Sequence, residues 1–141
     1  MPLIETKGAA SAQGFGGAGA GASGPVTYIE DVFSTYLYTG QTTATTVING
    51  IDLLGKGGMV WTKSRTSADS NYINYTNSGS PTYVLRTESS AAQVNESSSI
   101  SAWNSNGFTG WPGWTSKNLV SWTFRKQPKF FDVVRDRDWE T

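Results

Sequence analysis

The chain of 141 residues contains no cysteine and no histidine. Without cysteine it can form no disulfide, no thiolate nucleophile and no sulfur-ligated metal site. Without histidine it also lacks the commonest general base and a common zinc ligand. Asp69 and Asn71 have the spacing of a calcium loop, but the glycine and the bidentate glutamate of such a loop are missing. Few kinds of enzyme work without these residues, so we expect no catalytic residue, no metal and no cofactor, and a protein that is not an enzyme. Calcium at Asp69 is a minor alternative.

Charge is scarce and balanced. Lys and Arg number 11, Asp and Glu number 11, and only 16% of the residues are charged. A chain with no net charge has no overall field that would attract nucleic acid or an anionic membrane. Ser, Thr, Asn and Gly fill the surface instead, which suits a protein whose neighbours are copies of itself or glycans.

Long apolar runs are absent as well. No stretch approaches the roughly 20 residues of a membrane span. Residues 1–24 show neither the charged start nor the apolar run of a signal peptide. We expect a protein that is made in a cytoplasm and does not insert into a membrane.

The first 24 residues consist mostly of Gly, Ala and other small residues. Such a segment buries too little apolar surface to offset the entropy that it loses on ordering. We expect residues 1–24 to be an extended docking arm that orders only on assembly, with Leu3, Ile4 and Phe15 as its contacts. Gly14, Gly16 and Gly19 match a dinucleotide fingerprint by letter, but no strand precedes them and no helix follows, so that motif is rejected.

Residues 25–134 are predicted to form short strands separated by turns. β-branched and aromatic residues gather in segments bounded by Gly, Pro and Asn-Gly steps, after a single turn at Glu30 and Asp31. About eight such strands predict an all-β fold, an antiparallel β-sandwich. The polar stretches 64–80 and 87–99 are predicted as connections, and the alternating charges of 135–141 as a solvated end. The clearest strands are 34–38, 42–48, 59–63, 83–86, 100–103, 108–111 and 120–124.

The strand over 120–124 is expected to organise the sheet. Its residues alternate between apolar and small polar, which places Trp122 and Phe124 on one face and the residues between them on the other. We expect the aromatic face to be the buried one. Together with Trp61, Trp122 and Phe124 would then form the core, and removal of each ring would cost about 3–5 kcal/mol.

Three further tryptophans, Trp103, Trp111 and Trp114, crowd a loop-rich segment around a predicted hairpin turn. Indole rings beside Asn and Ser suit a subunit contact, local packing or stacking on sugar rings. The residues alone leave these uses open, although contacts and packing are the commoner role of such rings.

Several segments occur in a characteristic order: 33–40, 49–53, 57–63, Phe108 after 105–107, and 120–131. In this order they resemble a domain of bacteriophage tail-fibre and other virion proteins, especially of marine and cyanobacterial phages, and residues 7–16 resemble the start of phage tail proteins. The block from Trp122 to Lys126 is fairly specific. Unlike its relatives, the segment 67–75 has Asp69 but no His, and the chain does not continue past Phe131 into a second sandwich.

This resemblance implies a lectin-like or laminin-G-like β-sandwich, with a jelly-roll or laminin-G-like topology. It implies a structural virion component of a tailed phage, and the short chain favours a short tail-fibre or fibre-adaptor subunit located in the phage tail. Its partners would be other tail or baseplate proteins and copies of itself, with a homotrimer expected by analogy with fibres. A carbohydrate-binding module for a host surface glycan and a capsid decoration protein are the first two alternatives, and a depolymerase that acts on the host envelope is the third alternative for the function.

Overall fold

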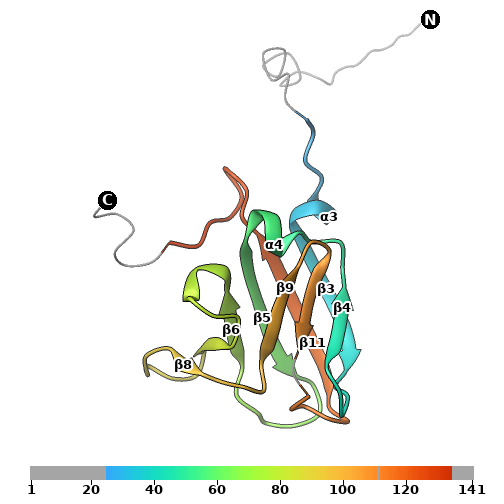
Figure 1. Cartoon of the computed structure of the whole chain (residues 1–141), viewed down its shortest axis with the longest axis vertical. Helices are drawn as coiled ribbons and strands as arrows, with labels where there is room; N and C mark the ends of the chain where they lie inside the picture. The colour runs from blue at the N-terminus through green and yellow to red at the C-terminus, as the bar shows by residue number, and fades with distance from the viewer. Residues whose placement is uncertain (1–24, 111, 135–141) are drawn as a thin grey trace, which may run out of the picture.

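The structure, a computed structural model, describes residues 25–110 and 112–134. Within these residues two antiparallel β-sheets account for most of the fold, so the predicted all-β architecture is confirmed (Figure 1). Two α-helices occur in the described part of the chain, α3 (Ile29–Val32) and α4 (Leu53–Lys56), and both are single turns at the same end of the fold. No helix of this described part is long and apolar enough to cross a membrane. The expected arm at 1–24 and the charged end at 135–141 lie outside the described residues.

The larger sheet has six strands in the order β3-β11-β5-β6-β7-β8. The strand that the sequence marks as central, β11, indeed lies inside this sheet, between β3 and β5. Trp122 of β11 lies opposite Thr35 of β3 on one side and Trp61 of β5 on the other. In chain order the strands are β3 (Phe33–Thr39), β5 (Gly58–Ser64), β6 (Tyr72–Tyr75), β7 (Tyr83–Arg86), β8 (Val94–Asn95) and β11 (Asn118–Arg125).

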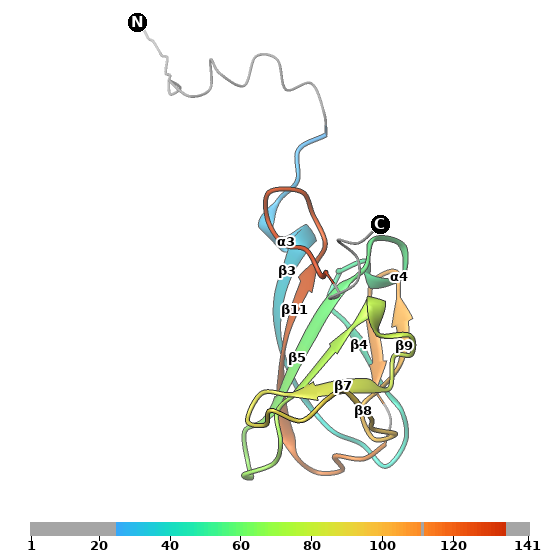
Figure 2. The ribbon, with the colours of Figure 1, turned by 90° about the vertical axis from the view of Figure 1, so that its left-hand side faces the viewer.

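The smaller sheet has three strands in the order β4-β10-β9 and faces the larger one (Figure 2). Its strands are β4 (Thr45–Ile48), β9 (Ile100–Asn104) and β10 (Gly107–Gly110). β9 and β10 form the hairpin that the turn residues predict. A 3-10 turn, η2 (Thr76–Ser78), follows β6 in the larger sheet.

The hydrophobic core lies between the two sheets. Phe108 is 1% exposed and its ring meets that of Tyr38 edge-on, with 6.4 Å between the ring centres. Tyr36 and Trp103 also pack against this core. The core cluster itself consists of Val47, Ile51, Leu53, Val60, Ile100 and Phe108.

The prediction that Trp61, Trp122 and Phe124 are core residues is wrong. Ser121 and Thr123, which alternate with the aromatic residues of β11, are 0% exposed. Alternation therefore turns Trp122 and Phe124 to the outer side of the larger sheet, where Trp61 lies opposite Trp122. The three rings are only partly buried. Rings from other strands already fill the space between the sheets, so β11 offers its small polar residues to that space.

The polar groups between the sheets are mostly hydrogen-bonded. Asn49 Nδ2 donates to Thr123 Oγ1 at 3.0 Å, which satisfies a hydroxyl in the middle of the larger sheet. Asn74 is 1% exposed, and its Nδ2 donates to the Pro81 carbonyl at 2.7 Å and to Ser99 Oγ at 3.1 Å. Paired in this way, buried polar side chains are compatible with a stable core.

Gly107 allows the edges of β10 and β4 to approach closely. Its φ is +151°, and a Cβ there would lie 1.9 Å from the Val47 carbonyl oxygen. Because that oxygen belongs to the backbone and cannot rotate away, Gly107→Ala is expected to lower the free energy of unfolding by about 2–3 kcal/mol in urea titrations. Gly110→Ala in the same strand, where the nearest atoms are 3.8 Å away, is the control and should cost less than about 0.5 kcal/mol. Equal stabilities of the two variants would contradict this packing.

Candidate functional site

The most unusual surface is the outer side of the larger sheet, which we call the outer face. An antiparallel sheet with one solvated side normally carries polar residues there. On β3, β5, β6 and β11, however, Lys63 is the one charged residue at an outward position. The outer face consists of Phe33, Thr35, Leu37, Thr39, Met59, Trp61, Lys63, Ile73, Tyr75, Asn118, Val120, Trp122 and Phe124.

Aromatic rings cover the centre and one end of the outer face. At the centre, the ring centres of Trp61 and Trp122 are 5.2 Å apart. Towards the end that carries α3, the centre of the Phe124 ring lies 4.9 Å from that of Phe33 and 5.2 Å from that of Phe131. Tilted pairs at these distances are favourable beyond the area that they bury, so the rings help to hold one another in place.

The outer face is also open to solvent. Leu37 on β3 is 60% exposed, and Leu85, next to the outer face on β7, is 37% exposed. Beside Leu85 lies a groove of about 620 Å³ between the sheet and the chain that follows β11. The Asn77 side chain donates to the Val133 carbonyl at 3.3 Å and helps to hold that wall in place. The groove is lined by Met59, Ile73, Tyr75, Leu85, Phe131, Asp132, Val133 and Val134.

Exposed apolar side chains gather at a second place, the end of the sandwich that carries α3 and α4. Val26 is 72% exposed, Tyr28 and Ile29 are each 61% exposed, and Leu54 on α4 is 68% exposed. Both helices lie at this end in Figure 1. We call it the arm end, because residues 1–24 connect to it through Pro25.

A hollow of about 670 Å³ at the arm end is lined by three lysines. Lys126 Nζ lies 3.2 Å from a carboxylate oxygen of Asp132, and this bond from Lys126 lowers the pKa of Asp132. Lys56 and Lys129 line the same hollow with Phe130, which is 43% exposed. The hollow is therefore weakly basic and partly apolar.

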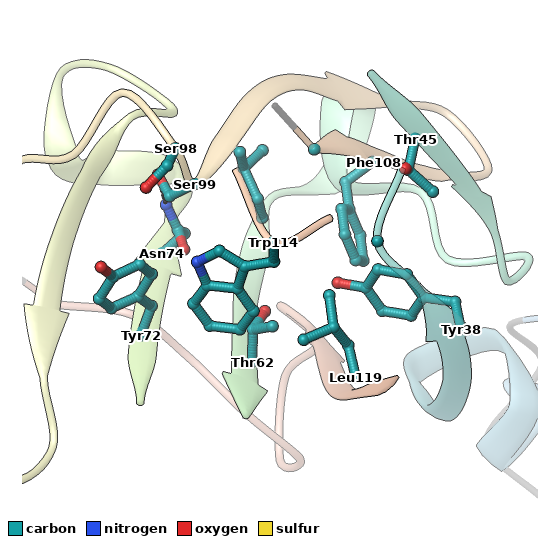
Figure 3. A pocket seen from close by; sticks show the side chains of 13 residues that line it. Tyr38, Thr45, Thr62, Tyr72, Asn74, Ser98, Ser99, Phe108, Trp114 and Leu119 are labelled. Carbon is teal, nitrogen blue, oxygen red and sulfur yellow. Dashed lines mark hydrogen bonds between the residues drawn. The ribbon is translucent and has the colours of Figure 1, made fainter. Parts of the chain in front are cut away.

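The third feature is a cavity between the sheets, beneath Trp114 (Figure 3). The Trp114 ring lies 5.1 Å from that of Tyr72, and Thr62 and Leu119 lie close by in Figure 3. The cavity holds about 30 Å³, which is room for one or two waters but not for a sugar ring. Burial raises the pKa of Tyr38 at its far wall, and the hydrogen bond with Thr62 opposes this only in part.

Polar groups connect Tyr72 to the neighbouring strands. Its hydroxyl donates to Glu96 Oε2 at 3.2 Å, and Arg86 donates to the same oxygen at 2.9 Å. Desolvation opposes ionisation of Glu96, but hydrogen bonds from Ser98, Arg86 and Tyr72 outweigh it and lower its pKa. The Arg86 guanidinium also lies 5.7 Å from the centre of the Tyr72 ring. Aromatic and charged groups thus meet beside Trp114.

The structure separates the tryptophans that the sequence groups as a possible glycan or subunit contact. Trp103 packs against the core and Trp114 stacks on Tyr72, so the two described members do not form one open platform. Trp111 lies outside the described residues, as do Leu3, Ile4 and Phe15 of the expected arm.

Sequence reasoning missed the outer face itself. The signal was present, because Met59, Trp61 and Lys63 alternate with Val60 and Thr62, and each set contains an apolar side chain. A strand that is apolar on both sides indicates a sheet that is covered on both sides.

Lys117 fastens the connection between β10 and β11 to Asp69. Its Nζ donates to both carboxylate oxygens, at 2.9 and 2.8 Å, and this bond, helped by Ser67, lowers the pKa of Asp69. A carboxyl with a lowered pKa stabilises the fold above its unfolded pKa, and this contribution is lost as the pH falls through the folded pKa. Lys117→Gln is expected to raise the pKa of Asp69 towards its ordinary value in a carbon-13 NMR titration. Lys56→Gln at the other end should leave it unchanged, and an equal effect of both variants would argue against the ion pair.

Fold and surface together define a small all-β domain whose larger sheet carries aromatic and aliphatic side chains on its outer face. The chain belongs to the family described as a domain of unknown function (DUF7483), whose model matches residues 29–129. That match runs from α3 to just beyond β11 and so includes all the named strands. No curated protein and no solved structure is significantly similar to the chain.

Proposed function

We propose that the chain is a structural virion component of a tailed phage, a short tail-fibre or fibre-adaptor subunit. In this proposal the sandwich self-associates through its outer face, and the arm at residues 1–24 docks the subunit. The observation that carries the proposal is the outer face, which is aromatic, open to solvent and charged only at Lys63. Contiguous apolar surfaces of this kind mark protein contacts.

The phage assignment is supported by the resemblance of residues 33–40 and 120–131 to virion domains. A structural subunit uses no catalysis, so the proposal includes no enzyme activity and no cofactor. In this proposal the chain contacts other tail or baseplate proteins and further copies of itself. The copies are arranged with three-fold symmetry, and the sandwich has a jelly-roll or laminin-G-like topology. It includes neither nucleic acid nor membrane insertion, and it places the protein in the tail after synthesis in the host cytoplasm.

Quantitative mass spectrometry of purified particles tests this proposal. The particles should come from the virus whose genome encodes the chain, and a major capsid protein serves as the internal standard. A fibre or adaptor subunit is expected at a small multiple of the fibre number. Hundreds of copies per particle would indicate a capsid decoration protein instead, and absence from washed particles would overturn a structural role.

Glycan binding is the second candidate, favoured by the aromatic and charged groups around Trp114. The Trp114–Tyr72 pair lies beside Arg86 and Glu96, a combination of ring and hydrogen-bonding groups that suits a sugar. The cavity below is too small for a sugar ring, so a glycan would have to lie across the rim. A screen of host surface polysaccharides with the full chain and with Trp114→Ala tests this role, because binding that survives the substitution would place it elsewhere.

A further inference from the structure

We infer that the outer face of one subunit is covered by residues 1–24 of a neighbouring copy. This inference rests on the self-association proposed above and names the segment that makes the contact. The arm of one subunit would then bind the sandwich of another, and this contact would account for both the docking and the self-association.

The direction in which the chain enters the fold favours a neighbour over the same subunit. In both Figure 1 and Figure 2 the described stretch from Pro25 to Tyr28 runs away from the end of the sandwich. Val26 and Tyr28 remain 72% and 61% exposed, so the described part of their own subunit leaves most of each side chain uncovered. An arm that starts in this direction would have to turn back to reach its own outer face.

The composition of the arm fits this surface. Glu5 and Lys7 are the charged residues of the arm, and from Gly8 to Ile29 the sequence contains none. The outer face carries only Lys63. The other segment within reach, 135–141, is charged at five of its seven positions and does not match an apolar sheet. Gly and Ala allow a backbone to approach flat aromatic rings closely, and Leu3, Ile4 and Phe15 can supply the anchoring side chains.

The length of the arm is sufficient. Twenty-four extended residues reach about 80 Å. The outer face is about 23 Å long, from seven residues of β5 at about 3.3 Å each, and about 19 Å wide across four strands. The arm can therefore bridge to a second subunit and cross its outer face with residues to spare.

An exchanged arm enlarges the contact between two copies. The flat footprint of the outer face is about 23 Å by 19 Å, and the arm adds its own surface to it. Where contacts are reciprocal, the exchange also holds the two subunits at a high effective concentration.

Cross-linking of single-cysteine variants tests this inference, because the natural chain contains no cysteine. Full-length Ala12→Cys is mixed with full-length Thr35→Cys, an exposed position on the outer face, and treated with a short bismaleimide. We expect a cross-linked product that contains one chain of each kind. It should form at least about tenfold faster than the product of Ala12→Cys with Thr46→Cys, whose cysteine lies on the opposite sheet. Phe15→Ser in the first chain should slow its formation about tenfold, since one anchoring side chain is lost.

The other outcomes overturn the inference in distinguishable ways. Equal rates with Thr35→Cys and Thr46→Cys would remove the arm from the outer face. If Thr35→Cys then forms homodimers rapidly, a second copy covers the face and the proposed self-association still holds. Cross-linking within one chain of the double variant Ala12→Cys/Thr35→Cys would show that the arm of the same subunit covers the face. Cross-linking of Glu140→Cys with Thr35→Cys would assign the face to the segment 135–141. A full chain that stays monomeric without cross-links would refute the proposed self-association itself.

Discussion

Phe108→Ala is expected to lower the free energy of unfolding by about 3–5 kcal/mol, the largest stability effect in the fold. Phe108 is 1% exposed and lies in the cluster that joins the two sheets. Removing its ring leaves a cavity between two rigid sheets, and the neighbouring Tyr38 cannot fill it without moving β3. Urea denaturation followed by far-ultraviolet circular dichroism measures the loss.

Trp122→Ala is the matched comparison, because it removes a larger ring from the outer face. Trp122 is only partly buried in the isolated subunit, so its loss should cost about 1–2 kcal/mol. The measurement is made at a concentration where the chain is monomeric. A larger loss for Trp122→Ala than for Phe108→Ala would mean that the core lies on the other side of β11.

Leu37→Glu is expected to weaken self-association at least about 100-fold while the subunit stays folded. Leu37 is 60% exposed on the outer face, opposite Val120, so a polar side chain there disturbs little in the single subunit. A buried carboxylate without a partner in the contact costs several kcal/mol, and about 2.7 kcal/mol corresponds to 100-fold. Size-exclusion chromatography with light scattering over a dilution series measures the change.

Thr46→Glu provides the control for this experiment. Thr46 is exposed on β4, on the outer side of the smaller sheet, and receives the same charge. Its association should match that of the natural chain, and the unfolding free energies of both variants should stay within about 0.5 kcal/mol of the natural value. An equal loss of association in the two variants would point to a general charge effect instead of a contact at the outer face.

Local signals in the sequence were enough to predict many of the elements. The turn residues from Asn104 to Gly107 predict the β9–β10 hairpin, and Pro128 predicts the end of β11 a few residues earlier. The single turn before β3 follows from Glu30 and Asp31. Each of these signals depends on neighbours in the chain, so no knowledge of the partner strand is needed.

The side of the sheet that faces the core could not be predicted in the same way. Alternation in β11 shows that its two faces differ, but the buried side depends on which rings other strands contribute. Phe108 and Tyr38 come from distant parts of the chain, and Leu119, Ser121 and Thr123 of β11 lie on the same side of the larger sheet. The short strands β6 and β8 were also missed, because they lie in polar stretches and are held by pairing with distant strands.

The outer face was not predicted as a site. Trp61, Trp122 and Phe124 were predicted as core residues, but they lie on the outer face. The grouping of Trp103 with Trp114 rested on closeness in sequence. The fold gives each of these two rings its own packing partner.

Sedimentation equilibrium of the full, unmodified chain tests the central claim most directly, since the claim is that the outer face is a contact between copies. The account expects a mass above one subunit at micromolar concentration, with three copies as the proposed state, and a return to one subunit with Leu37→Glu. If the natural chain has the mass of one subunit at every concentration up to about 100 µM, the claim is contradicted. A dissociation constant of 100 µM corresponds to about 5.5 kcal/mol of association free energy.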